Sequence, residues 1–229
     1  LAALVTRAGG VPNYLGIARD TSDDLRRLIR KGLDADLLLL SGGVSAGQLD
    51  LVPGVLHELG VREVFHKVNL KPGKPVWFGQ TEGGREGGRG KAEGGKSEVG
   101  VSDSAFRLPP SALRLSTLVF GLPGNPVSVM ACFELFVRPA IRRMMGFTDP
   151  GPRVVSACLT EAREYRSDRP TYWPASLELV ADGYRVRPVA WHGSPELRAT
   201  TDANAFAIFP PGDHQFSAGD RVQVLSTEY

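Results

Sequence analysis

Apolar positions in the first two thirds of the chain change repeatedly between helical and strand spacing. A helix is expected over residues 1–8, and a short strand is expected at residues 11–17. Leu25, Ile29 and Leu33 recur on one face of the next helix, which begins near Thr21. The remaining expected elements are strands at residues 36–40, 64–68, 75–79 and 117–122 and helices at residues 51–59 and 127–145. A continuous apolar run such as the one at residues 36–40 is typical of a parallel strand buried on both faces. The alternation therefore predicts an α/β fold with a mostly parallel sheet.

The segment between Gln80 and Leu115 has a different composition. It is rich in glycine and charged residues and has almost no apolar residue to bury between residues 83 and 100. We interpret about residues 81–114 as a surface insertion. Matching apolar runs flank it, so it is expected to connect two strands of the sheet.

Beyond Gly146 the pattern changes to short strands. A linker at residues 149–152 is followed by strand-like segments separated by turns. These segments are residues 154–159, 172–179, 184–188, 205–209 and 221–225. The sequence thus predicts an α/β domain over residues 1–148 and a small all-β domain over residues 151–229.

The composition limits the possible functions. The chain has 229 residues, of which 42% are hydrophobic, and a formal net charge of +2, so a nucleic-acid partner or a membrane surface is not expected. Cys132 and Cys158 lack the spacing of a disulfide framework or a zinc site and are expected to be reduced. No apolar run approaches the roughly 20 residues of a membrane span, so a cytoplasmic protein is expected.

The turn after the strand at residues 36–40 has the residues of an anion site. Gly42 and Gly43 allow backbone amides to approach an anion, and the hydroxyls of Ser41 and Ser45 add donors. Asp50 follows where a helix begins and is a candidate Mg²⁺ ligand. The alternative is an ordinary glycine-rich turn with Asp50 as a helix cap.

A second turn places two lysines close together. Lys71 and Lys74 are separated by Pro72 and Gly73 and followed by Pro75, which restricts the backbone. Two neighbouring ammonium groups repel each other unless an anion lies between them. The turn is therefore a candidate site for a tetrahedral oxyanion, although two solvated surface lysines would give the same pattern.

A third turn follows the strand at residues 117–122 and opens a helix. Pro123 and Gly124 form the turn, Asn125 suits the N-cap, and Ser128 lies in the first helical turn. These groups are expected at the same sheet edge as the other two turns. Their convergence distinguishes the segment from a simple helix start.

Several other catalytic patterns are absent from the sequence. It contains no GxGxxG fingerprint, no GxxxxGK[ST] loop and no GxSxG elbow. The histidines are scattered without metal-ligand spacing, at His57, His66, His192 and His214.

Three segments in this order resemble a known family. The run from Leu40 to Gly47 with Asp50, the Lys71-Pro-Gly-Lys-Pro turn, and the run from Phe120 to Ser128 resemble segments of molybdopterin molybdenumtransferases of the MoeA and gephyrin E-domain type. The resemblance extends from the first helix through Met145 and, more loosely, through the β domain. It implies a three-layer α/β/α molybdopterin-binding domain with a β-rich domain after it.

The resemblance also implies a reaction and roles for residues. Molybdate would be inserted into adenylylated molybdopterin with release of AMP, in a Mg²⁺-dependent reaction. Lys71, Lys74 and Ser128 would surround molybdate, and Asp50 would help to place Mg²⁺. The residues expected to hold the pterin or its phosphate are Ser41, Gly42, Gly43, Ser45, Pro123, Gly124 and Asn125.

The match is weaker in the β domain and at the start of the chain. Arg169 and Ser194 best match an arginine and a serine that the family contributes to the anion site, but Asp168 and Pro170 depart from its arginine-rich strand. The uncapped run that begins at Leu1 predicts a start inside a domain. We therefore expect a C-terminal fragment that lacks the family's N-terminal domains, is inactive alone and belongs to a homodimeric full-length protein.

Three alternatives carry different sequence features. A molybdopterin adenylyltransferase typically has a Gly-Gly-Thr-Gly turn where this chain has Val44 and Ser45, and it lacks the β domain. A competence-damage-type nucleotide hydrolase shares the broad fold but not the lysine turn. A gephyrin-like scaffold would bind a protein without catalysis, and it predicts that ligand binding survives loss of Lys71 and Lys74.

Overall fold

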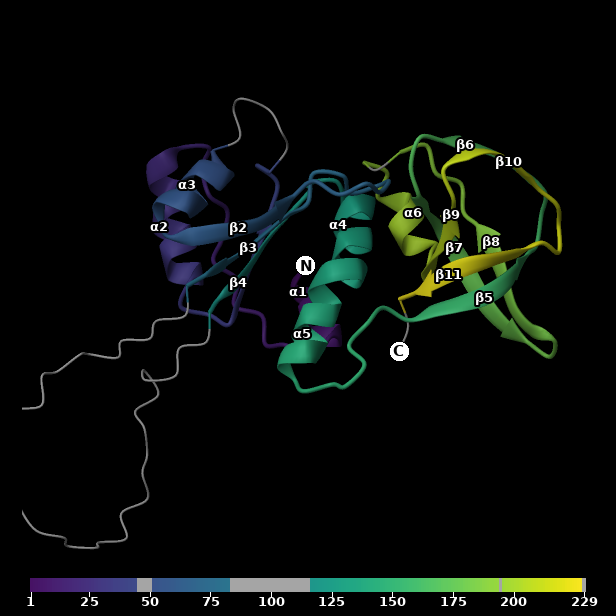
Figure 1. Cartoon of the computed structure of the whole chain (residues 1–229), viewed down its shortest axis with the longest axis horizontal. Helices are drawn as coiled ribbons and strands as arrows, with labels where there is room; N and C mark the ends of the chain where they lie inside the picture. Colours follow the sequence, from purple (N-terminus) through teal and green to yellow (C-terminus); the bar gives the residue numbers. More distant parts are fainter. Residues whose placement is uncertain (45–50, 83–115, 194, 228–229) are drawn as a thin grey trace, which may run out of the picture.

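The computed structural model describes residues 1–44, 51–82, 116–193 and 195–227. Within these residues the strands form a four-stranded sheet, a closed barrel and a separate two-stranded sheet. The four-stranded sheet and the barrel lie side by side, with helix α4 between them (Figure 1). No helix in the described ranges is long and apolar enough to cross a membrane.

The four-stranded sheet is mixed, so the expectation of a mostly parallel sheet is wrong. Its order is β1-β4-β3-β2, in which β1 pairs parallel with β4 while β3 pairs antiparallel with both β4 and β2. Two consecutive strands that pair in parallel need a crossover of a dozen or more residues between them. The segment between the end of β2 at His66 and the start of β3 at Trp77 is shorter than that. The bounds of the strands are Leu37–Ser41 (β1), Val61–His66 (β2), Trp77–Thr81 (β3) and Leu118–Leu122 (β4).

The glycine-rich insertion lies between two paired strands, as expected. Strands β3 and β4 flank it and pair antiparallel. The amide of Thr81 donates to the Thr117 carbonyl oxygen at 3.1 Å, and the amide of Thr117 donates to the Thr81 hydroxyl at 2.8 Å. Almost all of the insertion lies outside the described residues.

Helices cover both faces of this sheet and form three layers (Figure 1). Ile29 of α2 and Leu56 of α3 pack with Leu38 and Trp77 on one face. On the other face, Val129 and Phe133 belong to a second apolar cluster, against which α1 also packs. The helices are Ala2–Arg7 (α1), Ser22–Gly32 (α2), Val52–Glu58 (α3), Pro126–Cys132 (α4) and Arg138–Met144 (α5).

Two expected elements have a different form. Residues 11–17 are not a strand, because they pair with no strand in the described part of the chain; Val11 is 96% exposed and Ile17 86% exposed. The helix expected at residues 127–145 is interrupted by a π-helical turn at Phe133–Val137. Such turns are often found at functional positions.

The barrel contains every strand that the sequence predicted after residue 150. Its order is β11-β5-β8-β7-β9, and the two-stranded sheet pairs β6 with β10. Sequence analysis missed β6, β10 and the short helix α6, because most side chains of β6 and β10 are polar. The bounds are Val154–Leu159 (β5), Arg163–Ser167 (β6), Thr171–Val180 (β7), Gly183–Pro188 (β8), Arg198–Thr201 (α6), Ala205–Phe209 (β9), Gly212–Phe216 (β10) and Arg221–Ser226 (β11).

Helix α4 is buried against the sheet on one side and against the barrel on the other. Val129 and Cys132 pack with the strands of the sheet. Val127 and Ala131 pack with a barrel cluster that includes Trp191. The helix therefore fixes the position of the barrel relative to the sheet.

A buried ion pair lies within the helical segment that follows α4. Glu134 and Arg138, with side chains 1% and 4% exposed, form two short contacts of 2.6 and 2.8 Å. Arg138 also lies 3.5 Å from the Arg7 carbonyl oxygen, and the Arg7 guanidinium donates to the Thr227 carbonyl oxygen at 3.0 Å. These contacts connect α1, the π-helical turn and the end of the barrel.

We predict that Glu134→Gln destabilises the fold by about 3 kcal/mol, because it leaves the Arg138 charge buried without its carboxylate. Urea denaturation measures the change in the free energy of unfolding. Asp23→Asn is the control, since it removes an ion pair whose aspartate is 97% exposed; it should cost less than about 1 kcal/mol. Equal losses in the two variants would contradict this account of the buried pair.

Candidate functional site

Strand register brings the three predicted turns to one edge of the sheet. Ser41 lies opposite Leu122 where the parallel strands β1 and β4 end. Trp77, at the start of β3, lies opposite Gly121. The lysine turn just before β3 therefore lies at the same edge as the two glycine-containing turns.

The first and third turns contact each other through their backbones. The amide of Gly42 donates to the Leu122 carbonyl oxygen at 2.9 Å. A Cβ atom at Gly124 would lie 3.7 Å from the Gly42 Cα, which is ordinary van der Waals contact. Ser41, Gly43, Gly124 and Asn125 are exposed at this junction, whereas Pro123 is buried. The exposed groups are accessible to a ligand.

The lysine turn is seated on helix α4. Gly73 has a φ of 116°, and a Cβ atom there would lie 2.5 Å from the Cys132 Sγ. Only glycine fits this close approach without displacing its neighbours. Pro72 and Gly73 are buried, while the side chains of Lys71 and Lys74 stay exposed. The packing fixes the turn and directs its charges to the surface.

Ser128 is placed beside this turn by the first turn of α4. The residue is 3% exposed, and its carbonyl oxygen would lie 3.9 Å from a Cβ atom at Gly73. Asn125 is the N-cap and Pro126 begins the helix, as the sequence predicted, although no capping hydrogen bond from the Asn125 side chain is present. The structure thus brings Ser128 and the lysine turn together.

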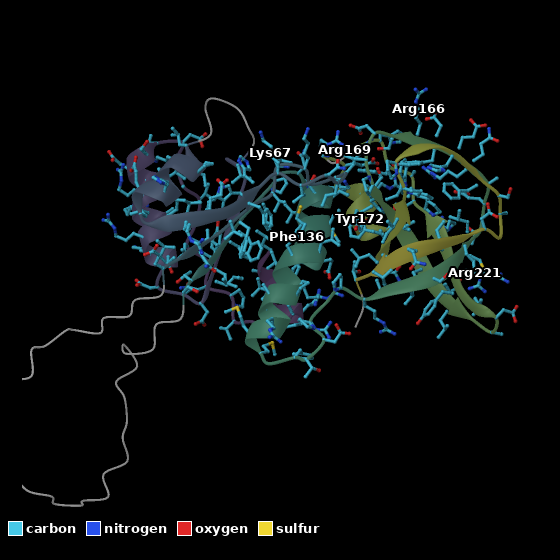
Figure 2. The ribbon with its side chains drawn as sticks, in the orientation of Figure 1. Lys67, Phe136, Arg166, Arg169, Tyr172 and Arg221 are labelled. Carbon is cyan, nitrogen blue, oxygen red and sulfur yellow. The ribbon has the colours of Figure 1, made fainter. Side chains whose placement is uncertain are left out.

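The barrel holds the lysine turn from the other side. The amide of Lys71 donates to the Pro170 carbonyl oxygen at 2.9 Å, and the amide of Tyr172 donates to the Lys71 carbonyl oxygen at 2.7 Å. Arg169 precedes this contact and lies with Lys67 along the same edge of the molecule (Figure 2). The predicted arginine of the β domain is therefore placed next to the predicted lysines of the α/β part.

Positive charge is concentrated at this edge. Within the described ranges, no carboxylate lies within 4.0 Å of the side-chain nitrogen of Lys67, Lys71 or Lys74. Arg169 has a partner, because its Nε lies 3.0 Å from the Asp168 carboxylate. The hydrogen bond from Arg169 is the main cause that lowers the pKa of Asp168, and the charge of Lys71 lowers it further.

Lys67 is a member of this group that sequence analysis missed. It was assigned to the end of a strand, but β2 ends at His66 and Lys67 has a φ of 69°. This left-handed conformation is unfavourable for a residue with a side chain. Two backbone hydrogen bonds hold it, from Lys67 to Val76 and from Val68 to Lys74, both at 2.9 Å.

Three predicted site residues lie outside the described residues, namely Ser45, Asp50 and Ser194. The residues that the structure places along the edge or just behind it are Ser41, Gly42, Gly43, Lys67, Lys71, Lys74, Pro123, Gly124, Asn125, Ser128 and Arg169. Among the described residues, no group of three or more His, Cys, Asp or Glu side chains gathers in a way that could hold a metal ion.

A cavity of about 360 Å³ lies away from this edge. It is lined by residues that include Cys158, Asp182 and Arg185. Val180 also lines it, at the opposite end of β7 from Thr171. The cavity and the cationic edge are therefore separate features of the surface.

Comparisons with known proteins agree over the whole chain. Residues 1–143 match the family described as a probable molybdopterin binding domain, and residues 157–227 match the MoeA C-terminal region (domain IV). A molybdopterin molybdenumtransferase of Nostoc sp. is 33% identical over 229 residues, which cover 98% of this chain and 45% of that protein. Gephyrin of Dictyostelium discoideum is 29% identical over 222 residues, which cover 93% of this chain and 28% of that protein.

A solved structure is also similar. The molybdopterin biosynthesis MoeA protein from Pyrococcus horikosii has a TM-score of 0.69 and 25% identity, covering 100% of this chain and 46% of that one. The chain thus spans less than half the length of each of these proteins.

We predict that Cys132 does not react with an aromatic disulfide reagent at pH 8 in the folded protein, whereas the partly exposed Cys158 does. Burial raises the pKa of Cys132 to about 12, so only about one molecule in ten thousand carries the thiolate at that pH. The rate of modification is measured on the Cys158→Ser variant. Gly73→Ala should accelerate it, because the new methyl group displaces the Cys132 sulfur. Rapid modification of Cys132 without Gly73→Ala would contradict the packing of the lysine turn on α4.

Proposed function

The chain belongs to the MoeA family of molybdopterin molybdenumtransferases, and we propose that its cationic edge binds molybdate for insertion into adenylylated molybdopterin with release of AMP. The proposal places the chain in molybdenum cofactor biosynthesis. It treats residues 1–148 as the molybdopterin-binding domain and residues 151–229 as the second domain.

The observation that carries the proposal is the gathering of unneutralised cations. Lys67, Lys71 and Lys74 belong to one connection that is pinned by α4 and by the barrel, and the described residues supply no carboxylate partner to them. Molybdate is a tetrahedral dianion. Cations that are fixed before it arrives stabilise it without the cost of moving them together.

Each fixed group has a distinct role in this proposal. The ammonium groups of Lys71 and Lys74 and the guanidinium of Arg169 donate hydrogen bonds to the oxygens of molybdate. Ser128, at the base of the lysine turn, adds a hydroxyl donor. Lys71 and Lys74 lie on either side of a bend at the buried Gly73, and both side chains are exposed to an incoming anion.

The adjoining turns suit the organic substrate. Ser41, Gly42 and Gly43 offer a hydroxyl and backbone amides that a phosphate group can approach closely. Gly124 and Asn125 complete the same surface from the end of β4. We assign the pterin and its phosphate to these turns, and Ser45 and Ser194 to the same site by their sequence motifs.

The proposal includes Mg²⁺, which Asp50 would help to hold. The charge of a bound Mg²⁺ would polarise the phosphoanhydride that is cleaved. Asp50 lies outside the described residues, and the described part contains no group of three potential ligands.

A scaffold function is the competing proposal, because a gephyrin is among the relatives. It makes the cationic edge dispensable, whereas the transferase proposal makes it essential.

We extend the transferase proposal to a homodimer, as the family resemblance implies.

We predict that the double change of Lys71→Ala and Lys74→Ala abolishes saturable binding of molybdate to this chain, because it removes two of the cations that surround the oxyanion. Isothermal titration calorimetry measures the binding. The free energy of unfolding should change by less than about 0.5 kcal/mol, since both side chains are exposed.

The control removes two exposed positive charges from the last turn of α2, with Arg30→Ala and Lys31→Ala. This turn precedes β1 and so lies at the opposite edge of the sheet, and binding should be retained. Binding that survives the loss of Lys71 and Lys74 would overturn the transferase site and favour the scaffold.

A further inference from the structure

Asp168 is the one carboxylate among the described residues that forms an ion pair with a cation of the candidate edge. Its Oδ1 accepts a hydrogen bond from the Arg169 Nε at 3.0 Å. Its side chain is 74% exposed, whereas that of Arg169 is 23% exposed. The carboxylate is therefore free to leave the pair, and the guanidinium is the more fixed partner.

The turn that carries this pair is fixed by its own hydrogen bonds. The Thr171 hydroxyl lies 3.2 Å from the Ser167 Oγ and 3.3 Å from the Arg169 carbonyl oxygen. The amide of Arg169 donates to the Ser167 Oγ at 3.4 Å. Thr171 is completely buried. The backbone of Arg169 is thus held in place without any contribution from the Asp168 side chain.

The same turn is tied to the lysine turn of the other domain. Pro170, the next residue after Arg169, accepts a hydrogen bond from the amide of Lys71 at 2.9 Å. Lys71 also contributes to the electrostatic environment of Asp168, where it lowers the pKa of the carboxyl group. The negative charge of Asp168 is consequently placed where the molybdate of the proposed function would bind.

We propose that Asp168 is an internal counter-anion of the oxyanion site: its carboxylate occupies Arg169 in the free protein and is displaced when the oxyanion binds. This inference rests on the proposed function. It makes Asp168 a residue that sets affinity, because an incoming anion has to compete with a tethered one and is repelled by its charge.

The position of Asp168 in the sequence bears on its role. Asp168 directly precedes Arg169 in the sequence. The chain thus has a negative charge immediately beside a cation of the candidate edge. A counter-anion lowers the affinity for oxyanions in general and keeps the edge from holding abundant anions when the substrate is absent.

The test measures binding of two tetrahedral oxyanions of similar size to this chain, molybdate with two negative charges and perrhenate with one. Calorimetry at pH 8 and low ionic strength compares the unsubstituted chain with Asp168→Asn. A unit charge a few ångströms from the ligand in a water-like medium changes the Kd of a monoanion roughly threefold and that of a dianion roughly tenfold. We expect molybdate to bind about tenfold more tightly to the variant and perrhenate about threefold.

The dependence on ligand charge separates an electrostatic role from a structural one. A change of turn structure would alter the two Kd values by similar factors, and that result would overturn the proposal. Asp168→Glu keeps the charge. The logarithm of its Kd for molybdate should therefore fall by less than half as much as it does in Asp168→Asn. Asp182→Asn removes an exposed aspartate at the opposite end of β7 and should give no gain.

The remaining outcomes are also decisive. Unchanged or weaker molybdate binding to Asp168→Asn would overturn the counter-anion while leaving the oxyanion site intact. If neither oxyanion binds to the unsubstituted chain or to Asp168→Asn, the oxyanion site of the proposed function fails, and the counter-anion fails with it.

Discussion

Helix α4 is packed from two sides, and this constraint places the lysine turn, Ser128 and the barrel relative to the sheet. One side contributes Val129 and Cys132 to the core of the sheet, and the other contributes Val127 and Ala131 to the cluster shared with the barrel. Close-packed interiors allow little sliding, so the helix sets the distance between the two halves of the molecule. Gly73 of the lysine turn rests on the same helix.

Cations from both halves gather at one edge as a result of this packing. The backbone of Lys71 forms hydrogen bonds with Pro170 and Tyr172, so the connection between β2 and β3 is joined to the start of β7. Like charges held this close are unfavourable without an anion. The fold opposes their repulsion with buried apolar surface and backbone hydrogen bonds, and a bound oxyanion would turn the repulsion into attraction. The Asp168 carboxylate partly supplies that negative charge within the protein itself.

Sequence reasoning located what depends on local composition and missed what depends on pairing. Glycine and proline mark the turns at Gly42, Gly73 and Gly124, and the register of β1 with β4 brings these turns to one edge as expected. The prediction of a mostly parallel sheet was wrong because apolar runs do not reveal whether neighbouring strands run parallel. Lys67 was missed because its left-handed φ is held by contacts with the turn that follows. Strands β6 and β10 were missed because most of their side chains are polar, so apolar and polar residues do not alternate clearly along them.

The central claim is that an oxyanion binds where the lysine turn meets the barrel. Anomalous diffraction at the molybdenum absorption edge, from a crystal of the chain soaked in molybdate, tests it most directly. The account predicts a molybdenum peak beside Lys71 and Lys74, placed so that molybdate oxygens lie within hydrogen-bond distance of both ammonium groups. Arg169 is expected to turn toward the same ion. A peak at another surface, with this edge empty although molybdate binds in solution, would contradict it.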